Sequence, residues 1–212
     1  MGHASEPAFV VLHALRLKGF AQPDVIAATT ALPEGEIGKI LDGAAADGLA
    51  QKREGRISGW ALTGAGRERH AKLLSEEVEA AGCRDTVDDA YRRFLDVNRD
   101  LLQVCTDWQM RPGPDGSQVV NDHSDAKYDQ AVIGRLRAID TAVQPVCRDV
   151  AAVLDRFAGY GPRLATAVDR VEAGDLDYAT KPMIDSYHAV WFELHEDLLS
   201  TLGIERATEG VS

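Results

Sequence analysis

Glycine and proline divide the first third of the chain into short amphipathic segments. In three of these segments, apolar residues recur at the three- and four-residue spacing of a helix. We predict these helices at residues 7–18, 22–32 and 34–47. Gly48 follows the third segment, where a glycine in the left-handed conformation commonly ends a helix. Residues 49–54 and 57–63 are short strand-like runs separated by a polar glycine turn, which predicts a β-hairpin.

The stretch GWALTGAGRERHAKLL, residues 59–74, joins the second strand of this hairpin to a charged helical run. We expect Trp60 and Leu62 to be the inward-facing residues of the strand. Thr63 stands at the strand exit, where its hydroxyl can accept a hydrogen bond from a free backbone N–H of the next helix. The two glycines that follow allow the tight turn between strand and helix.

Beyond residue 67 the apolar pattern is helical, and we expect no strand there. The predicted helices are residues 66–82, 86–110, 126–160, 161–174 and 182–203. Pro145 is expected to kink or split the third of them. Residues 111–125, rich in Pro, Gly, Asn and Asp, form the one predicted long loop.

The order of three helices, a hairpin and an exit helix is the layout of a winged helix-turn-helix. The phrases Asp47-Gly48-Leu49 and Leu62-Thr63-Gly64-Ala65-Gly66-Arg67 resemble the end of the third helix and the wing exit of MarR-type regulators. PadR-type regulators share the L-T-x-x-G phrase. The resemblance covers about residues 5–75 and implies a mainly α protein, with an N-terminal winged helix-turn-helix carrying a small β-wing and a C-terminal helical bundle domain.

The expected domains are a winged helix-turn-helix at 5–75, a helical dimerisation and effector domain at 76–205, and a frayed tail at 206–212. MarR-type proteins usually have a dimerisation helix ahead of the winged domain, whereas this chain starts almost at the first winged-domain helix. We therefore expect a homodimer formed through the C-terminal helices, as in PadR-type regulators.

Composition indicates a globular, cytoplasmic protein. Of the 212 residues, 45% are hydrophobic and 27% are charged, which is ordinary for a soluble domain. No apolar run approaches the ~20 residues of a membrane span, and no signal-peptide pattern opens the chain, so we expect no membrane partner. Cys83, Cys105 and Cys147 are widely separated, which indicates reduced thiols. The last two are interpreted as core residues rather than redox sensors.

The formal net charge of −11 is unevenly distributed. Residues 1–75 hold nine Lys and Arg against eight Asp and Glu, whereas residues 76–212 hold fourteen against twenty-six. The acidic part repels phosphate, so contacts to double-stranded DNA must come from the first third. In the implied fold, the third helix enters the major groove and the wing meets the neighbouring backbone. The candidate DNA-binding residues are Lys39, Gln51, Lys52, Arg53, Arg56 and Arg67.

The third predicted helix is acidic for a DNA-reading element. Its outward residues are Glu34, Glu36, Lys39, Asp42 and Asp47. An alternative interpretation is therefore a winged domain that contacts a protein, such as an enzyme that it regulates, and binds no DNA.

The last predicted helix carries Asp185, His188 and His195 on one face. Together with loop residues 121–125 they could ligate a metal or hold an anionic effector. The alternative is that His188 and His195 are ordinary half-buried residues and that Asp122 or Asp125 caps helix 126–144. We predict no metal and no cofactor, and a small-molecule effector pocket lined by Trp108, Tyr128, Tyr187, His188, Trp191 and His195.

The sequence contains no nucleophile elbow, P-loop or dinucleotide-binding glycine motif, so no enzymatic activity is predicted. The function expected from the sequence is that of a MarR-like, DNA-binding transcriptional regulator. In a homodimer of this kind, an effector would alter the spacing of the two winged domains.

Overall fold

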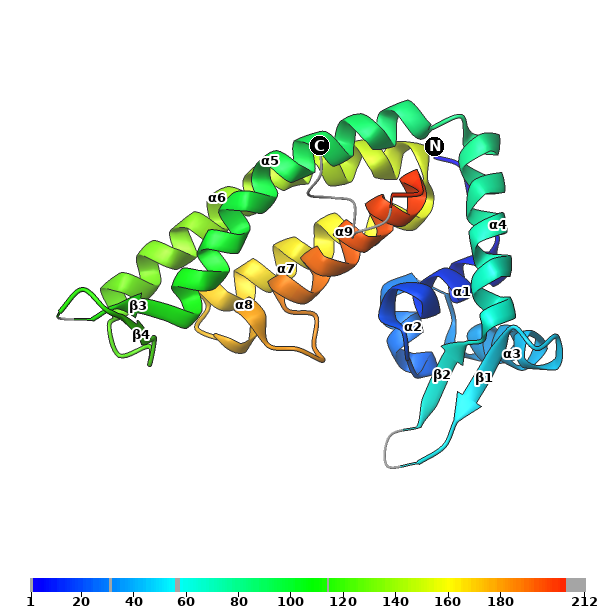
Figure 1. The fold of residues 1–212 in the computed structure, drawn as a ribbon, viewed down its shortest axis with the longest axis horizontal. Helices are drawn as coiled ribbons and strands as arrows, with labels where there is room; N and C mark the ends of the chain where they lie inside the picture. Colours follow the sequence, from blue (N-terminus) through cyan, green and yellow to red (C-terminus); the bar gives the residue numbers. More distant parts are fainter. Residues whose placement is uncertain (1, 31, 56–57, 114, 205–212) are drawn as a thin grey trace.

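A computed structural model describes residues 2–30, 32–55, 58–113 and 115–204. The chain is mainly helical and carries two small antiparallel sheets (Figure 1). The predicted mainly α composition is confirmed. A small N-terminal module and an elongated helical domain are joined by the helix α4, Gly64–Ala81 (Figure 1).

The N-terminal module comprises three helices and one hairpin, close to the predicted segments. Its elements are α1 (Pro7–Lys18), α2 (Pro23–Thr30), α3 (Glu34–Ala46), β1 (Ala50–Arg53) and β2 (Gly59–Leu62). β1 pairs with β2 in an antiparallel register that sets Ala50 opposite Leu62. The segment between α1 and α2 joins this sheet, because the backbones of Ala21 and Trp60 exchange hydrogen bonds of 3.0 and 2.8 Å. The hairpin is thereby fixed to the helices of the module.

The strand exit is built as the sequence predicts. The hydroxyl of Thr63 accepts a hydrogen bond from the backbone N–H of Gly66 at 3.0 Å and donates to the carbonyl of Gly48 at 2.7 Å. Gly48 has a φ of +70°, as expected for a glycine that ends a helix. A Cβ atom at position 66 would lie 1.9 Å from the carbonyl oxygen of Leu49, so this position accepts only glycine. Gly48, Thr63 and Gly66 thus connect three elements: the end of α3, the hairpin and α4.

The helical domain is built on two long antiparallel helices. Its elements are α5 (Arg84–Gln109), β3 (Met110–Pro112), β4 (Gln118–Val120), α6 (Ala126–Val153), the 3-10 helix η1 (Asp155–Gly159), α7 (Tyr160–Glu172), α8 (Asp177–Thr180) and α9 (Tyr187–Leu202). α7 and α9 lie along the α5–α6 pair, and β3–β4 forms the far tip of that pair (Figure 1). Its core is separate from that of the N-terminal module among the described residues.

The prediction that no strand follows residue 67 was wrong. β3 and β4 pair antiparallel, with Met110 opposite Val120. Met110 was predicted to end helix 86–110, and the other five strand residues lie in the predicted loop. The hairpin continues directly from the end of α5, and the N–H of Asn121 donates to the carbonyl of Gln109 at 2.8 Å. The two strands span three residues each, too short for an alternating pattern to show in the sequence.

The predicted helix 126–160 is divided at Leu154 and not at Pro145. α6 runs through Pro145 without interruption. The backbone of Leu154 is extended. On either side of it, the carbonyl of Val153 accepts a hydrogen bond from the N–H of His3, and the N–H of Asp155 donates to the carbonyl of His3. The break therefore depends on a segment that is distant in the sequence.

The last helix begins five residues later than the position predicted from Pro182. Ser186 is its N-cap, and its hydroxyl accepts from the N–H of Ala189 at 3.3 Å. The preceding stretch includes the short helix α8, which was not predicted.

Candidate functional site

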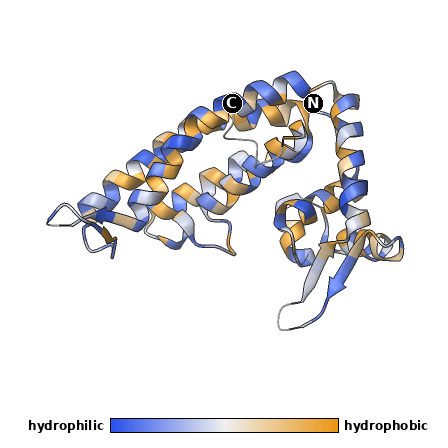
Figure 2. Ribbon diagram, in the orientation of Figure 1, coloured by the Kyte–Doolittle hydropathy of each residue, from blue (hydrophilic) through white to orange (hydrophobic). Residues whose placement is uncertain are grey.

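One polar surface of the N-terminal module lies on β1. Ala50 is buried, whereas the candidate residues Gln51, Lys52 and Arg53 are all exposed. β1 is the hydrophilic strand of a hairpin that projects away from the helical domain (Figure 2). The Nζ atom of Lys52 lies 3.4 Å from a carboxylate oxygen of Glu54, an exposed pair that leaves the ammonium accessible. Arg56 lies outside the described residues.

The second candidate surface is the outer side of α3. Ile37, Leu41 and Ala44 face the core, and Lys39 is exposed on the other side. The exposed acidic residues around it are Glu34, Glu36, Asp42 and Asp47. Hence this surface has net negative charge, as the sequence indicates. Arg67 is exposed at the start of α4, and its guanidinium donates to the carbonyl of Leu62 at 3.2 Å.

The structure divides the six predicted effector-pocket residues into two groups. Tyr187, Trp191 and His195 are buried on α9, where the ring centroids of Trp191 and His195 lie 4.6 and 5.0 Å from that of Phe94. His188 is exposed on the same helix.

The other two members lie near the β3–β4 tip. Trp108 is buried, and its ring centroid lies 4.6 Å from that of His123. The hydroxyl of Tyr128 lies 3.0 Å from the carbonyl oxygens of Asp107 and Met110. Five of the six side chains therefore pack in or against the helical core. A cavity lies between the N-terminal module and the helical domain, and none of the six side chains lines it.

The acidic and histidine side chains that the sequence singled out have other partners. Asp185 accepts two hydrogen bonds of 2.9 Å from the guanidinium of Arg163. His123 lies 3.0 Å from a carboxylate oxygen of Asp129, and Asp125 caps α6. Within the described ranges, no three potential metal ligands converge. The arrangement agrees with the alternative of helix caps and ordinary side-chain pairs.

The cysteine thiols are buried or half-buried. Burial raises the pKa of Cys105 to about 11 and that of Cys147 to about 12. A thiolate is therefore disfavoured at both positions, which supports their interpretation as core residues.

A buried polar cluster joins the N-terminal module to the helical domain. We name it the junction network; its members are His13 on α1, His70 and Glu77 on α4, Arg156 on η1, and Asp197 and Thr201 on α9. This cluster was not predicted from the sequence, because its members come from distant parts of the chain and form no motif. One signal was available: Asp197 occupies the buried stripe of α9 that also contains Leu194 and Leu198.

Arg156 is the centre of the junction network, and its side chain is only 2% exposed. Its Nε donates to Glu77 at 2.8 Å, one terminal nitrogen donates to Asp197, and the other donates to the hydroxyl of Thr201 at 2.7 Å. Asp197 also accepts from the hydroxyl of Tyr160 at 2.9 Å. Every charged group of the network thus has a partner of opposite charge, as burial requires.

Two histidines extend the junction network into the N-terminal module. Nε2 of His13 lies 3.0 Å from Asp197, and Nδ1 of His13 lies 2.9 Å from Nε2 of His70. Burial, reinforced by His13 and by nearby arginines, lowers the pKa of His70 to about 3. Burial alone would raise the pKa of Asp197, but the Arg156 guanidinium and His13 hold it well below its usual range. Near neutral pH, His70 is therefore uncharged and Asp197 is ionised.

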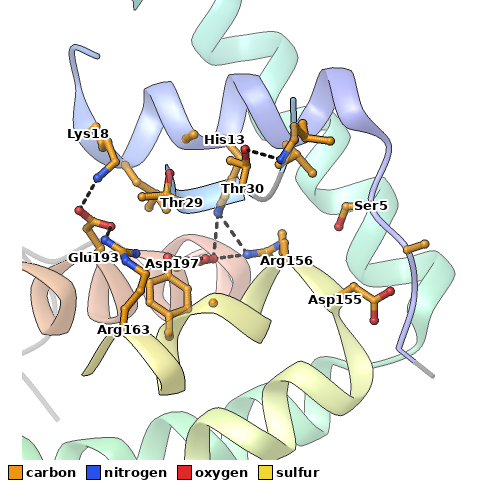
Figure 3. A pocket seen from close by; sticks show the side chains of 17 residues that line it. Ser5, His13, Lys18, Thr29, Thr30, Asp155, Arg156, Arg163, Glu193 and Asp197 are labelled. Carbon is orange, nitrogen blue, oxygen red and sulfur yellow. Dashed lines mark hydrogen bonds and ion pairs between the residues drawn. The ribbon is translucent and has the colours of Figure 1, made fainter. Parts of the chain in front are cut away.

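A cavity of about 260 Å³ lies beside this network. Side chains from α1 and α2 face side chains from η1, α7 and α9 across it (Figure 3). At one end, Glu193 accepts from Lys18 at 2.7 Å and from Arg163 at 2.8 Å. We name this space the junction cavity. Because both parts of the protein line it, anything bound there would contact both.

Comparison of the chain with protein-family models, with curated proteins and with solved structures finds no match. The inference of function therefore depends on the residues and their geometry. Among the described helices, none combines the length and apolarity that crossing a bilayer requires.

Proposed function

We propose that the protein is a DNA-binding transcriptional regulator of MarR-like type, whose N-terminal module is a winged helix-turn-helix. The element order of the module and the strand-like contact of Ala21 with β2 support this assignment. The observation that carries it is the β1–β2 hairpin, which projects from the module with Gln51, Lys52 and Arg53 exposed on one strand.

In this proposal, α3 enters the major groove and the hairpin follows the adjacent backbone. Lys52 and Arg53 neutralise phosphates, while Lys39 is the cation available on α3 among the described residues. Affinity for DNA depends on the number of phosphates neutralised, so one copy with so few cations binds weakly. Two copies in a homodimer double the contacts, and the helical domain would provide the interface.

A second candidate function is favoured by the acidic surface of α3. Glu34, Glu36 and Asp42 are exposed where a DNA-reading helix would meet phosphates, and like charges repel. This surface suits a basic patch on a protein partner. In that case the module regulates the partner, for example an enzyme, and binds no DNA.

A fluorescence-anisotropy titration against mixed genomic fragments at two salt concentrations tests the proposal. Binding that weakens steeply with salt, by a protein that light scattering shows to be a dimer, supports a DNA-binding regulator. Absence of binding at low salt, or binding that does not respond to salt, supports the protein-interaction alternative. Fragments enriched by the protein from genomic DNA would then identify the operator.

A further inference from the structure

The junction cavity has an aliphatic wall, part of which belongs to neither hydrophobic core. Val10, Ala14 and Leu17 follow one stripe of α1 and line the cavity together with Leu32. Val10 and Leu17 are half-buried, and among the described residues neither belongs to the core of the N-terminal module or to that of the helical domain. An uncovered aliphatic stripe inside a cavity is suited to an apolar ligand.

One end of the cavity is polar and provides spare hydrogen-bond donors. The side chains of Lys18 and Arg163 are each only 13% exposed. Lys18 uses one of its three N–H groups, on Glu193, and the Nη1 atom of Arg163 has no hydrogen bond to any described residue. Both carboxylate oxygens of Glu193 already accept from these two cations. The group that best complements this end is therefore an anionic acceptor.

We propose that the junction cavity binds a small aliphatic carboxylate. Its carboxylate group would lie at Lys18 and Arg163, and its chain would lie along Val10 and Leu17. The cavity volume of about 260 Å³ corresponds to roughly eight or nine water molecules at ~30 Å³ each, which fits a chain of medium length.

Binding there has a direct structural consequence. The Lys18–Glu193 ion pair connects α1 to α9, and a ligand carboxylate that accepts from the remaining N–H groups of Lys18 would be held at this connection. The ligand also contacts elements on both sides of the cavity, so it favours one arrangement of the N-terminal module over others. This inference is independent of DNA binding, because it concerns the free protein.

Calorimetric titration of the full chain with four probes tests the inference. Octanoate is expected to bind and to raise the melting temperature. Octan-1-ol has the same chain without the charge and should bind at least about tenfold more weakly, as expected for loss of a charge-assisted hydrogen bond. Acetate, which lacks the chain, and octylammonium, which has the opposite charge, should not bind. Equal binding of octanoate and octylammonium, or no binding of octanoate, would overturn the inference.

Two variants test the position of the site. Lys18→Gln should weaken octanoate binding at least about tenfold. Leu17→Trp should abolish it by filling the cavity. Lys72→Gln is the matched control, because Lys72 is exposed on α4 and away from the cavity lining. Circular dichroism establishes that each variant is folded. Unchanged octanoate binding in both folded cavity variants would show that the ligand binds elsewhere.

Discussion

Nε2 of His13 lies 3.0 Å from a carboxylate oxygen of Asp197, so the first helix of the chain contacts α9 through a buried polar contact. Both side chains are almost inaccessible to solvent. The hydrophobic cores on either side are separate among the described residues, and the junction between them is largely polar. The position of the N-terminal module therefore depends on hydrogen bonds and charge as well as on apolar packing.

Removing the central cation should destabilise the protein strongly. Arg156→Met leaves Glu77 and Asp197 buried without their arginine, and loss of one partner of a buried pair costs about 3–5 kcal/mol. Urea unfolding measures this change. The control Arg99→Met removes an exposed arginine and should change the free energy of unfolding by less than about 0.5 kcal/mol. Equal effects of the two substitutions would show that the junction network does not stabilise the fold.

The buried His70 should make stability depend on pH. Its pKa is about 3 in the folded protein and 6.5 in its ordinary state, so below pH 6.5 the unfolded chain takes up a proton that the folded chain does not. Stability therefore falls as the pH decreases from 6.5, by roughly 2–3 kcal/mol down to pH 4.5. Asp197 has a depressed pKa, and its contribution is lost only at more acidic pH, below the ordinary carboxyl value.

Urea unfolding at several pH values between 6.5 and 4.5 measures this dependence. His70→Gln should reduce the slope, since glutamine does not titrate there. His188→Gln is the control, because His188 is exposed on α9 and should leave the slope as it is. A slope that persists unchanged in His70→Gln would assign the proton uptake to other groups.

Replacing Gly66 by alanine should destabilise the protein, whereas the same substitution at Gly64 should not. Gly66→Ala places a Cβ atom 1.9 Å from the carbonyl oxygen of Leu49, so the backbone must move, at a cost on the order of 3 kcal/mol. Gly64→Ala meets no atom within 4 Å and should be neutral or stabilising by up to about 1 kcal/mol. Thermal unfolding of the two variants compares them directly. A Gly66→Ala protein as stable as Gly64→Ala would contradict the packing of α4 on Leu49.

The hairpin cations should determine the salt dependence of DNA binding. If Lys52 and Arg53 each neutralise one phosphate, replacing both by alanine should reduce the slope of log affinity against log salt by about two. Anisotropy titrations at four salt concentrations provide the slope. Arg99→Ala serves as control, because its guanidinium is exposed on the acidic helical domain. An unchanged slope in the double variant, with DNA still bound, would place the phosphate contacts elsewhere.

The sequence predicted the elements that depend on near neighbours. The amphipathic segments of α1, α3 and α5 and the threonine cap at Thr63 follow from residues three or four positions apart. Such signals are contained in a short window of sequence, because helix periodicity and capping are local. The polar residues of β1 are likewise adjacent in the sequence: Gln51, Lys52 and Arg53 follow one another, and all three are exposed.

The tertiary structure decided the features that depend on distant partners. α6 ends at Val153 because the chain beyond it pairs with His3, and Arg156 is buried because Glu77 and Asp197 arrive from two other helices. The aromatic residues predicted to line a pocket pack instead in the helical core, while the junction cavity forms between parts of the chain that are far apart in sequence. Burial and charge pairing are properties of packed helices, so a local pattern of residue types does not determine them.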